Sequence, residues 1–400
     1  MTTTPTNWVL PFSGRGIDYT EEDIEAVAEA MRSGDPLTQG LYLERLEQRF
    51  SQMMGGLPSF GVSSCTSALE LSAVLSRVGA GDEVIIPAHT YCASAIPFAR
   101  TGARLVWADI EPDTRVVSAE TIASLVTEHT KAIVVVHLYG LAAPMGPIMD
   151  LAHERGILVI EDCAQAIGAA VDGRPVGSIG DFGCFSFHGQ KNITTMGEGG
   201  ILVVGSEKTA KLVPGLRHNG HRPYPVPREH YWVPAMVDTD FDIEGVWPFN
   251  YSIGEAQCAL GVRLLDQVDE ISAVRRGKAR SILDAVSGYA ELSPQAIPDG
   301  STHVYHLLSF RYDGGPHGKS RDDLIASLVY EHRIQAVVQY YPLYRYPLFA
   351  KAGFGEANCP NTDHFFDNML SVPFYPWFDA DQTEYLAVRL VESLNKLRTG

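Results

Sequence analysis

A single lysine, Lys191, stands in a polar segment between two stretches with the pattern of buried strands. The chain runs from the alternating residues 185–187 through Lys191 to a glycine-rich turn and the apolar run 201–204. A lysine between buried strands is costly unless it is solvated, paired or neutral, and one whose pKa falls on burial can form a Schiff base with a carbonyl group. Taken alone, this stretch is explained equally well by a surface lysine on a hairpin.

An aspartate, Asp162, follows a second apolar run at residues 157–160. The carboxyl ends of strands in an α/β sheet border the ligand crevice, so Asp162 is expected to project into it. A carboxylate there, together with Lys191, suits pyridoxal phosphate, because the lysine binds the aldehyde and the carboxylate keeps the pyridine nitrogen protonated. Gln165 is then placed to hydrogen-bond the phenolic oxygen of that cofactor.

These two stretches resemble the DegT/DnrJ/EryC1/StrS family of sugar aminotransferases, a branch of the fold type I pyridoxal-phosphate enzymes. The family pattern is a serine, then Phe-His or similar, then lysine and Gly-Glu-Gly-Gly, which is matched here by Ser186, Lys191 and residues 197–200. The resemblance runs from about Gly14 to about Leu397, with several separated motifs in family order. It implies that Ser186 is a cofactor-binding residue.

The resemblance also assigns the phosphate and the ring of the cofactor to residues earlier in the chain. Residues 60–69 read as a strand, a tight turn and a helix whose free N–H groups would attract a phosphate, with Thr66 and Ser67 at the family's phosphate positions. Cys65 replaces the usual glycine. Tyr91 follows the next strand and matches an aromatic residue that stacks on the cofactor ring. Without the resemblance, Thr66 and Ser67 would be ordinary capping residues.

A segment later in the chain, residues 248–261, resembles one that contacts the neighbouring subunit in the family. There an asparagine reaches from one subunit to the phosphate bound in the other, and Asn250 holds this position. The resemblance therefore implies a homodimer with shared active sites. Ser252 stands where the family has an arginine.

Four residues are candidates for contact with substrate. Residues 216–230 are a basic run inside an acidic protein, and His221 and Arg222 belong to it. An anion-attracting loop over the site and an ordinary solvated loop explain the run equally well. His188 lies close to Lys191 in the chain, and Tyr341 falls in a segment that resembles one near the family's substrate mouth.

The spacing of strands and helices predicts the architecture. Four hundred residues suit a large domain plus a smaller one, and 45% hydrophobic and 20% charged residues are typical of a globular protein. Strands, including one over 132–140, alternate with helices, which predicts a doubly wound sheet. The resemblance implies the fold type I α/β structure: residues 1–265 with a mostly parallel seven-stranded sheet, and 266–400 as a smaller α+β domain.

Charge and composition disfavour several classes of protein. A formal charge of −17 repels nucleic acid and anionic membranes. No apolar run approaches the roughly 20 residues of a membrane span, and residues 1–6 lack the features of a signal peptide. Six cysteines without a CxxC pair indicate reduced thiols and a cytoplasmic protein. His218 and His221 lack a third ligand at a recognisable spacing, so no metal site is predicted.

These patterns predict a pyridoxal-phosphate aminotransferase that works in two half-reactions, with Lys191 as the acid and base. The resemblance implies that it moves an amino group from glutamate or glutamine to a keto-sugar, nucleotide-linked in the main prediction, or to a keto-cyclitol. Such reactions belong to secondary-metabolite, antibiotic or cell-surface sugar biosynthesis.

Three other functions are alternatives to this one. A cofactor-dependent sugar dehydratase of the same fold would carry histidine in place of Lys191. A non-catalytic regulator or scaffold would have no need of the complete set of cofactor residues. A nicotinamide enzyme would show a G-x-G-x-x-G motif after the first strand, and none follows it here.

Overall fold

The computed structural model describes residues 5–221, 243 and 245–399. Its centre is a seven-stranded sheet in the order β1-β9-β8-β5-β4-β2-β3. The strands are β1 (Ser59–Val62), β2 (Glu83–Pro87), β3 (Arg104–Ala108), β4 (Thr130–Val136), β5 (Leu158–Asp162), β8 (Phe182–Ser186) and β9 (Gly200–Val204). The five strands from β8 to β3 are parallel, whereas β9 pairs antiparallel with both β1 and β8. The predicted α/β class with a mostly parallel sheet is therefore confirmed.

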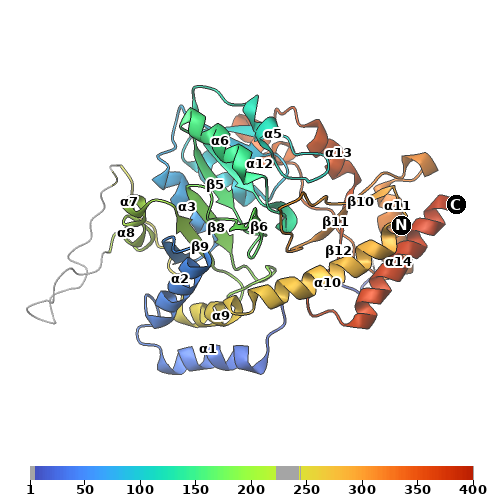
Figure 1. The fold of residues 1–400 in the computed structure, drawn as a ribbon, viewed down its shortest axis with the longest axis horizontal. Coiled ribbons are helices and arrows are strands. Elements are labelled where there is room, and N and C mark those ends of the chain that lie inside the picture. Colours follow the sequence, from blue (N-terminus) through green and yellow to red (C-terminus); the bar gives the residue numbers. More distant parts are fainter. Residues whose placement is uncertain (1–4, 222–242, 244, 400) are drawn as a thin grey trace, which may run out of the picture.

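Helices cover this sheet because its central strands are mostly apolar and buried along most of their length. Helix α3 (Cys65–Leu75) packs against β8 and β9, and α6 (Met145–Arg155) packs against β5. Helices α1 (Glu21–Ser33) and α2 (Leu41–Met53) pack together with α9 (Glu255–Leu265) beside the sheet (Figure 1). The shorter elements of this part are α4 (Ile96–Arg100), α5 (Ala119–Ala123), α7 (Glu207–Ala210), α8 (Val213–Arg217), β6 (Ala170–Val171) and β7 (Arg174–Pro175).

A smaller sheet forms the second part of the molecule. Strands β10 (Leu292–Pro294), β11 (Leu308–Tyr312) and β12 (Met369–Val372) are antiparallel. The long helix α10 (Val268–Val286) runs from the end of α9 to this sheet, where it packs against α14 (Ala380–Thr399) (Figure 1). The remaining helices are α11 (Arg321–Ala326), α12 (Pro347–Phe349) and α13 (Pro360–Asn368).

Two separate apolar clusters accompany the two sheets. The predicted boundary after residue 265 coincides with the end of α9. However, residues on each side of this boundary pack into the apolar cluster of the other part. Phe349 and Phe365 pack into the cluster of the large sheet, and Leu10 packs into that of the small sheet. The domain division at residue 265 stays a prediction, and both ends of the chain contribute to the part around the small sheet.

The strand predicted over 132–140 is shorter than expected. Strand β4 ends at Val136, and Leu138–Gly140 forms a 3₁₀ turn in which Tyr139 has a φ of 60°. The backbone N–H of Tyr139 donates to Gln165 Oε1 at 2.7 Å. The N–H of Tyr139 is thus bonded to a side chain and not to a neighbouring strand. The chain departs from the sheet at the edge where the candidate site lies.

No helix within the described residues is both long and apolar enough to cross a lipid bilayer.

Candidate active site

A cavity of about 330 Å³ opens at the carboxyl edge of the large sheet. This volume lies within the range of small-molecule pockets, roughly 300–1,000 Å³. Five chain segments that are far apart in sequence supply its walls, namely the start of α3, the segment after β2, the end of β5, the loop between β8 and β9, and the segment that contains Gln339 and Tyr340. The lining includes Ser64, Cys65, Thr66, Thr90, Tyr91, Asp162, Gln165, Ser186, His188, Gln190, Lys191, Glu198, Gln339 and Tyr340.

Lys191 reaches this cavity from a loop that its own backbone holds in place. Its N–H donates to the His188 carbonyl at 2.9 Å, and the N–H of Gly189 donates to the Gly197 carbonyl at 2.8 Å. Burial lowers the pKa of Lys191, although the negative charge of Asp162 partly opposes that shift. The lowered pKa increases the neutral amine fraction, which is the form that attacks a carbonyl carbon.

Asp162 ends β5, and its side chain is only 5% exposed. Ser94 Oγ donates to Asp162 Oδ2 at 2.7 Å, and the backbone N–H of Ala164 donates to Oδ1 at 3.0 Å. Thr90 Oγ1 lies 3.0 Å from Ser94 Oγ. These contacts hold the carboxylate in one orientation at the cavity wall. Sequence reasoning assigned no role to Ser94, although a polar residue just after a buried strand was the available signal.

The start of α3 forms the end of the cavity that suits an anion. Ser64 caps the helix by accepting from the Ser67 N–H at 3.1 Å, and Ser64, Cys65 and Thr66 line the cavity. Free N–H groups and the helix dipole favour a phosphate at such a terminus. Ser67 is placed differently from the expectation: it does not line the cavity, and its hydroxyl lies within 3.0 Å of the hydroxyls of Ser63 and Ser64.

The glycines after the Lys191 loop let β9 approach α3 closely. A Cβ atom added to Gly200 would lie 2.6 Å from the carbonyl carbon of Ser64 and 2.7 Å from the nitrogen of Cys65. A side chain at Gly200 would therefore push the helix terminus out of the cavity wall. Cys65 itself is buried, and burial raises the pKa of its thiol, so the thiol stays protonated.

Aromatic rings and an amide complete the region between Asp162 and the opening. Tyr91 is 55% exposed, and its ring centroid lies 5.8 Å from that of Tyr340. Because Gln165 Oε1 accepts from the Tyr139 N–H, the other end of the amide, Nε2, is a donor toward the cavity and lies 3.3 Å from the Tyr340 hydroxyl. Tyr340 was not singled out from the sequence.

The four candidate substrate residues fare differently. His188 lines the cavity, with Nε2 3.9 Å from the Glu198 carboxylate. Tyr341 does not line it: its ring packs edge-on against two other rings, and its neighbour Tyr340 takes the place at the wall. His221 does not line the cavity either, and its ring centroid lies 4.9 Å from that of His218. Arg222 lies outside the described residues.

Asn250 is exposed and does not line the cavity of its own chain. Its backbone pairs with that of His218 in an isolated bridge, and His218 Nδ1 lies 2.8 Å from Ser252 Oγ. The residue that replaces the family's arginine thus supports a local turn. The predicted contact of Asn250 with a second subunit stays a prediction.

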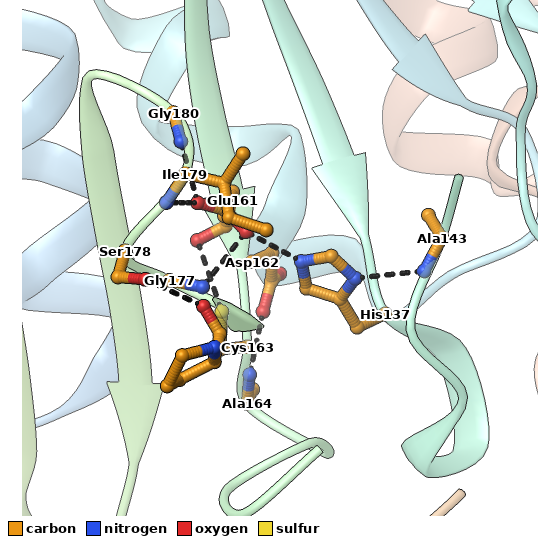
Figure 2. Close-up of polar contacts among 11 residues, drawn as sticks. His137, Ala143, Glu161, Asp162, Cys163, Ala164, Gly177, Ser178, Ile179 and Gly180 are labelled. Atoms are coloured by element: carbon orange, nitrogen blue, oxygen red, sulfur yellow. Dashed lines mark hydrogen bonds and ion pairs between the residues drawn. The ribbon is translucent and has the colours of Figure 1, made fainter. Parts of the chain in front are cut away.

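A buried cluster of His137, Glu161 and Cys163 lies directly behind Asp162 (Figure 2). The Glu161 carboxylate accepts from His137 Nε2 at 3.0 Å and from the backbone N–H groups of residues 177, 179 and 180 at 2.7 to 2.8 Å. His137 Nδ1 accepts from the Ala143 N–H, which makes Nε2 the protonated nitrogen. These bonds occupy the lone pairs that a metal ion would need, so the cluster braces the end of β5.

The charge of Glu161 is compatible with its burial. Burial alone would raise the pKa of Glu161, but the hydrogen bond from His137 and those from the backbone lower it, and the resulting pKa lies below the ordinary value. Glu161 is therefore a buried carboxylate anion whose four donors stabilise it.

Known proteins of one family match this chain along almost its entire length. The model of the DegT/DnrJ/EryC1/StrS aminotransferase family matches residues 18–391. The spore coat polysaccharide biosynthesis protein SpsC of Bacillus subtilis is 31% identical over 94% of this chain and 95% of its own. UDP-N-acetyl-3-dehydro-alpha-D-glucosamine 3-aminotranferase of Acidithiobacillus ferrooxidans is 32% identical over 88% of each chain. GDP-perosamine synthase of Vibrio cholerae is 31% identical over 89% of this chain and 92% of its own.

Solved structures agree with this match. The aminotransferase from Psychrobacter cryohalolentis superposes with a TM-score of 0.87 at 26% identity, covering 97% of this chain and 100% of that one. The putative sugar aminotransferase Spr1654 from Streptococcus pneumoniae has a TM-score of 0.86 in its PMP form, at 27% identity and with the same coverage. Its PLP form has a TM-score of 0.85, covering 97% of this chain and 99% of that one at the same identity.

Proposed function

Because the chain belongs to the DegT/DnrJ/EryC1/StrS aminotransferase family, we propose that it transfers an amino group from glutamate or glutamine to a nucleotide-linked keto-sugar. The protein is a pyridoxal-phosphate-dependent aminotransferase of the α/β class. The identities of the amino donor and the acceptor are the proposed part. The cofactor supplies an electron sink, so that a proton can leave the carbon atom that bears the nitrogen.

The cavity residues fit this cofactor. Lys191 presents an amine of lowered pKa for the aldehyde, and Asp162 keeps acceptor capacity beyond its two hydrogen bonds for a protonated pyridine nitrogen. Thr66, at the start of α3, stands where an anion is favoured. The observation that carries the proposal is that Lys191 and Asp162, from separate segments, line one cavity of suitable volume.

The chain's own residues divide the work between proton transfer and orientation. Lys191 Nζ takes a proton from the donor's α-carbon and later returns one to the carbon of the acceptor, for which an amine of lowered pKa is suited. Asp162 maintains the charge on the pyridine ring. Tyr91 and Tyr340 bound the cavity and limit the entry of water.

The nucleotide-linked acceptor is supported by the names of relatives. The Acidithiobacillus relative is named for a UDP-linked sugar and the Vibrio relative for a GDP-linked sugar. His188 at the cavity wall is a further polar contact for such a substrate.

A screen of acceptors tests this proposal. The enzyme, loaded as the pyridoxamine phosphate form, would be mixed with keto-sugars linked to UDP, dTDP and GDP and with free keto-inositols, and the return of the pyridoxal absorbance recorded. We expect at least one nucleotide-linked ketone to react fastest. Reaction with a keto-inositol alone would replace the proposed acceptor with a cyclitol, and reaction with none would reject both classes.

We further propose that the enzyme is a homodimer whose sites are shared. The exposed position of Asn250, away from its own cavity, suits contact with a phosphate in a neighbouring subunit. Mixing inactive Lys191→Ala with inactive Asn250→Trp should then restore activity, because a heterodimer contains one site with both residues intact. If subunits demonstrably exchange and the mixture stays inactive, the sites are not shared.

A further inference from the structure

A second, smaller cavity adjoins the first on the side of the small sheet. Its volume is about 50 Å³, and it shares Gln190, Lys191, Gln339 and Tyr340 with the cofactor cavity. The rest of its wall comes from Phe12, Ser13, Arg275, His306, Leu307, Val372, Phe374 and Tyr375. Whatever occupies it lies next to Lys191.

Arg275, on α10, brings a buried cation to this cavity. It is 2% exposed, with Nε donating to the Tyr305 carbonyl at 2.8 Å and Nη2 to the His306 carbonyl at 2.9 Å. Its third nitrogen, Nη1, is buried and has no hydrogen-bond partner, and no carboxylate of the described residues lies within ion-pair distance. Burial lowers the pKa of Arg275 to about 9, which still leaves the guanidinium charged at neutral pH.

His306 supplies a second unpaired group in the same wall. It is 6% exposed, and its Nδ1 is buried without a partner. Burial lowers the pKa of His306 well below its ordinary value, and the neighbouring charges of Lys191 and Arg275 add to the effect. A neutral imidazole carries one N–H, and the tautomer with this hydrogen on Nδ1 donates to an anion.

A buried cation without a counter-ion and a buried imidazole nitrogen without a partner are costly in one cavity wall, and an anion that contacts both would remove that cost. We infer that Arg275 and His306 form the subsite for the α-carboxylate of the amino donor. The inference rests on the proposed function, because it assumes an α-amino acid as donor. A carboxylate there places the attached amine beside Lys191, where the nitrogen is transferred.

The size of the cavity favours a carboxylate over the acceptor's larger anions. A cavity of about 10–15 Å³ on this measure holds one water molecule, so about 50 Å³ suits a small group such as a carboxylate and is much smaller than the cofactor cavity of about 330 Å³. Because Arg275 Nη2 is already bonded to a carbonyl, the expected contact is a single charge-assisted hydrogen bond from Nη1 and a second bond from His306.

The decisive variant is Arg275→Met, which keeps the apolar stem and removes the charge. Arg276→Gln is the matched control, since Arg276 is the next residue of α10 and is exposed. Conversion of bound pyridoxal phosphate to the pyridoxamine form would be followed against the concentration of L-glutamate, L-glutamine and propylamine, an amine without a carboxylate. We expect an increase of about 10- to 100-fold in the apparent Kd of the amino acids for Arg275→Met, with propylamine and the control unchanged.

A binding measurement separates the subsite from catalysis. Glutarate, which has carboxylates but no amine, would be titrated into the cofactor-loaded protein by calorimetry, and its affinity should fall in Arg275→Met by the same factor. If Arg275→Met does not fold, the pair His306→Leu and His306→Gln decides, because only glutamine keeps an N–H donor. We expect weaker amino-acid binding in His306→Leu and partial recovery in His306→Gln.

The outcomes distinguish this inference from the proposed function. Equal affinity for amino acids and glutarate in the wild type and in the folded Arg275 or His306 variants would overturn the subsite, even in an enzyme that aminates a nucleotide-linked ketone. Loss of acceptor affinity with unchanged donor affinity would assign the cavity to the acceptor and also overturn it. A protein that binds glutarate through Arg275 but aminates no ketone would retain the subsite and contradict the proposed function.

Discussion

Strand β5 ends with two adjacent carboxylates, Glu161 and Asp162, whose side chains lie on opposite faces of the sheet and differ in their hydrogen bonds. Successive side chains of a strand point to opposite faces, so Glu161 points to the buried cluster with His137 (Figure 2). Asp162 points to the other face, where it lines the cavity. Both are buried, but Glu161 accepts four hydrogen bonds and Asp162 only two. Unused acceptor capacity, rather than burial, distinguishes the carboxylate suited to a ligand from the one that stabilises the fold.

The largest loss of turnover should come from a substitution of Lys191, which lines the cavity on the same side as Asp162. Lys191→Ala should fold and yet lose turnover to the background rate, because no other amine lines the cavity within the described residues. Visible absorbance of the lysine-bound cofactor and steady-state turnover would be measured, with Lys211→Ala as an exposed control. A bound cofactor that borohydride fixes to a different lysine would show that the assignment is wrong.

Asp162→Asn should lower turnover with little change in the stability of the protein. An amide does not hold the pyridine nitrogen protonated, so turnover should fall by at least about 100-fold while cofactor remains bound and the melting temperature changes little. Asp150→Asn, at an exposed position of α6, is the control. Near wild-type turnover in Asp162→Asn would make Asp162 a second structural carboxylate and remove the contrast with Glu161.

Glu161→Gln should give the opposite result. The amide nitrogen of glutamine is a donor, so it would face N–H groups that donate to the carboxylate in the wild type and would leave them without an acceptor. The free energy of unfolding should therefore fall by about 2 to 4 kcal/mol. Turnover of the protein that remains folded should change less than in Asp162→Asn. Denaturant unfolding measures the loss, and Glu154→Gln on the exposed face of α6 is the control.

The pH dependence of this difference follows from the lowered pKa of Glu161. A carboxyl group with a folded pKa below its unfolded value of about 4.3 stabilises the protein above that pH, and the contribution is lost as the pH falls through the folded pKa. The stability gap between wild type and Glu161→Gln should therefore be full at pH 7 and shrink in acid. A gap that stays constant down to pH 3 would assign the effect to packing.

The smallest effect should come from Ser94, which orients Asp162 without lining the cavity itself. Ser94→Ala removes one of the two hydrogen bonds to the carboxylate, and turnover should fall by about 3- to 10-fold. The control is Ser76→Ala, because the buried Ser76 hydroxyl bonds only a helix carbonyl. If both variants lose the same activity, the contact between Ser94 and Asp162 has no special role.

Residues within short motifs were predicted from the sequence because their roles follow from neighbours along the chain. Lys191 precedes a glycine turn, and Asp162 and Gln165 follow the apolar run 157–160, so the sequence alone predicts that Asp162 projects into the crevice at the edge of the sheet. These residues line the cavity, although their roles in cofactor binding stay predictions. Ser67 and Tyr341 do not line the cavity, whereas their neighbours Thr66 and Tyr340 do, because the orientation of a side chain on a turn depends on local hydrogen bonds; the predicted roles of Ser67 and Tyr341 stay predictions.

Patterns along the chain thus determined the α/β class and the alternation of strands with helices. They also singled out Lys191 and Asp162. The tertiary structure alone decided that Ser94 would hold Asp162, that Glu161 would be saturated, and that Arg275 and His306 would meet beside Lys191. The physical reason is range. Periodicity and turn chemistry act over a few residues, whereas hydrogen-bond satisfaction in a buried site depends on groups brought together from distant segments.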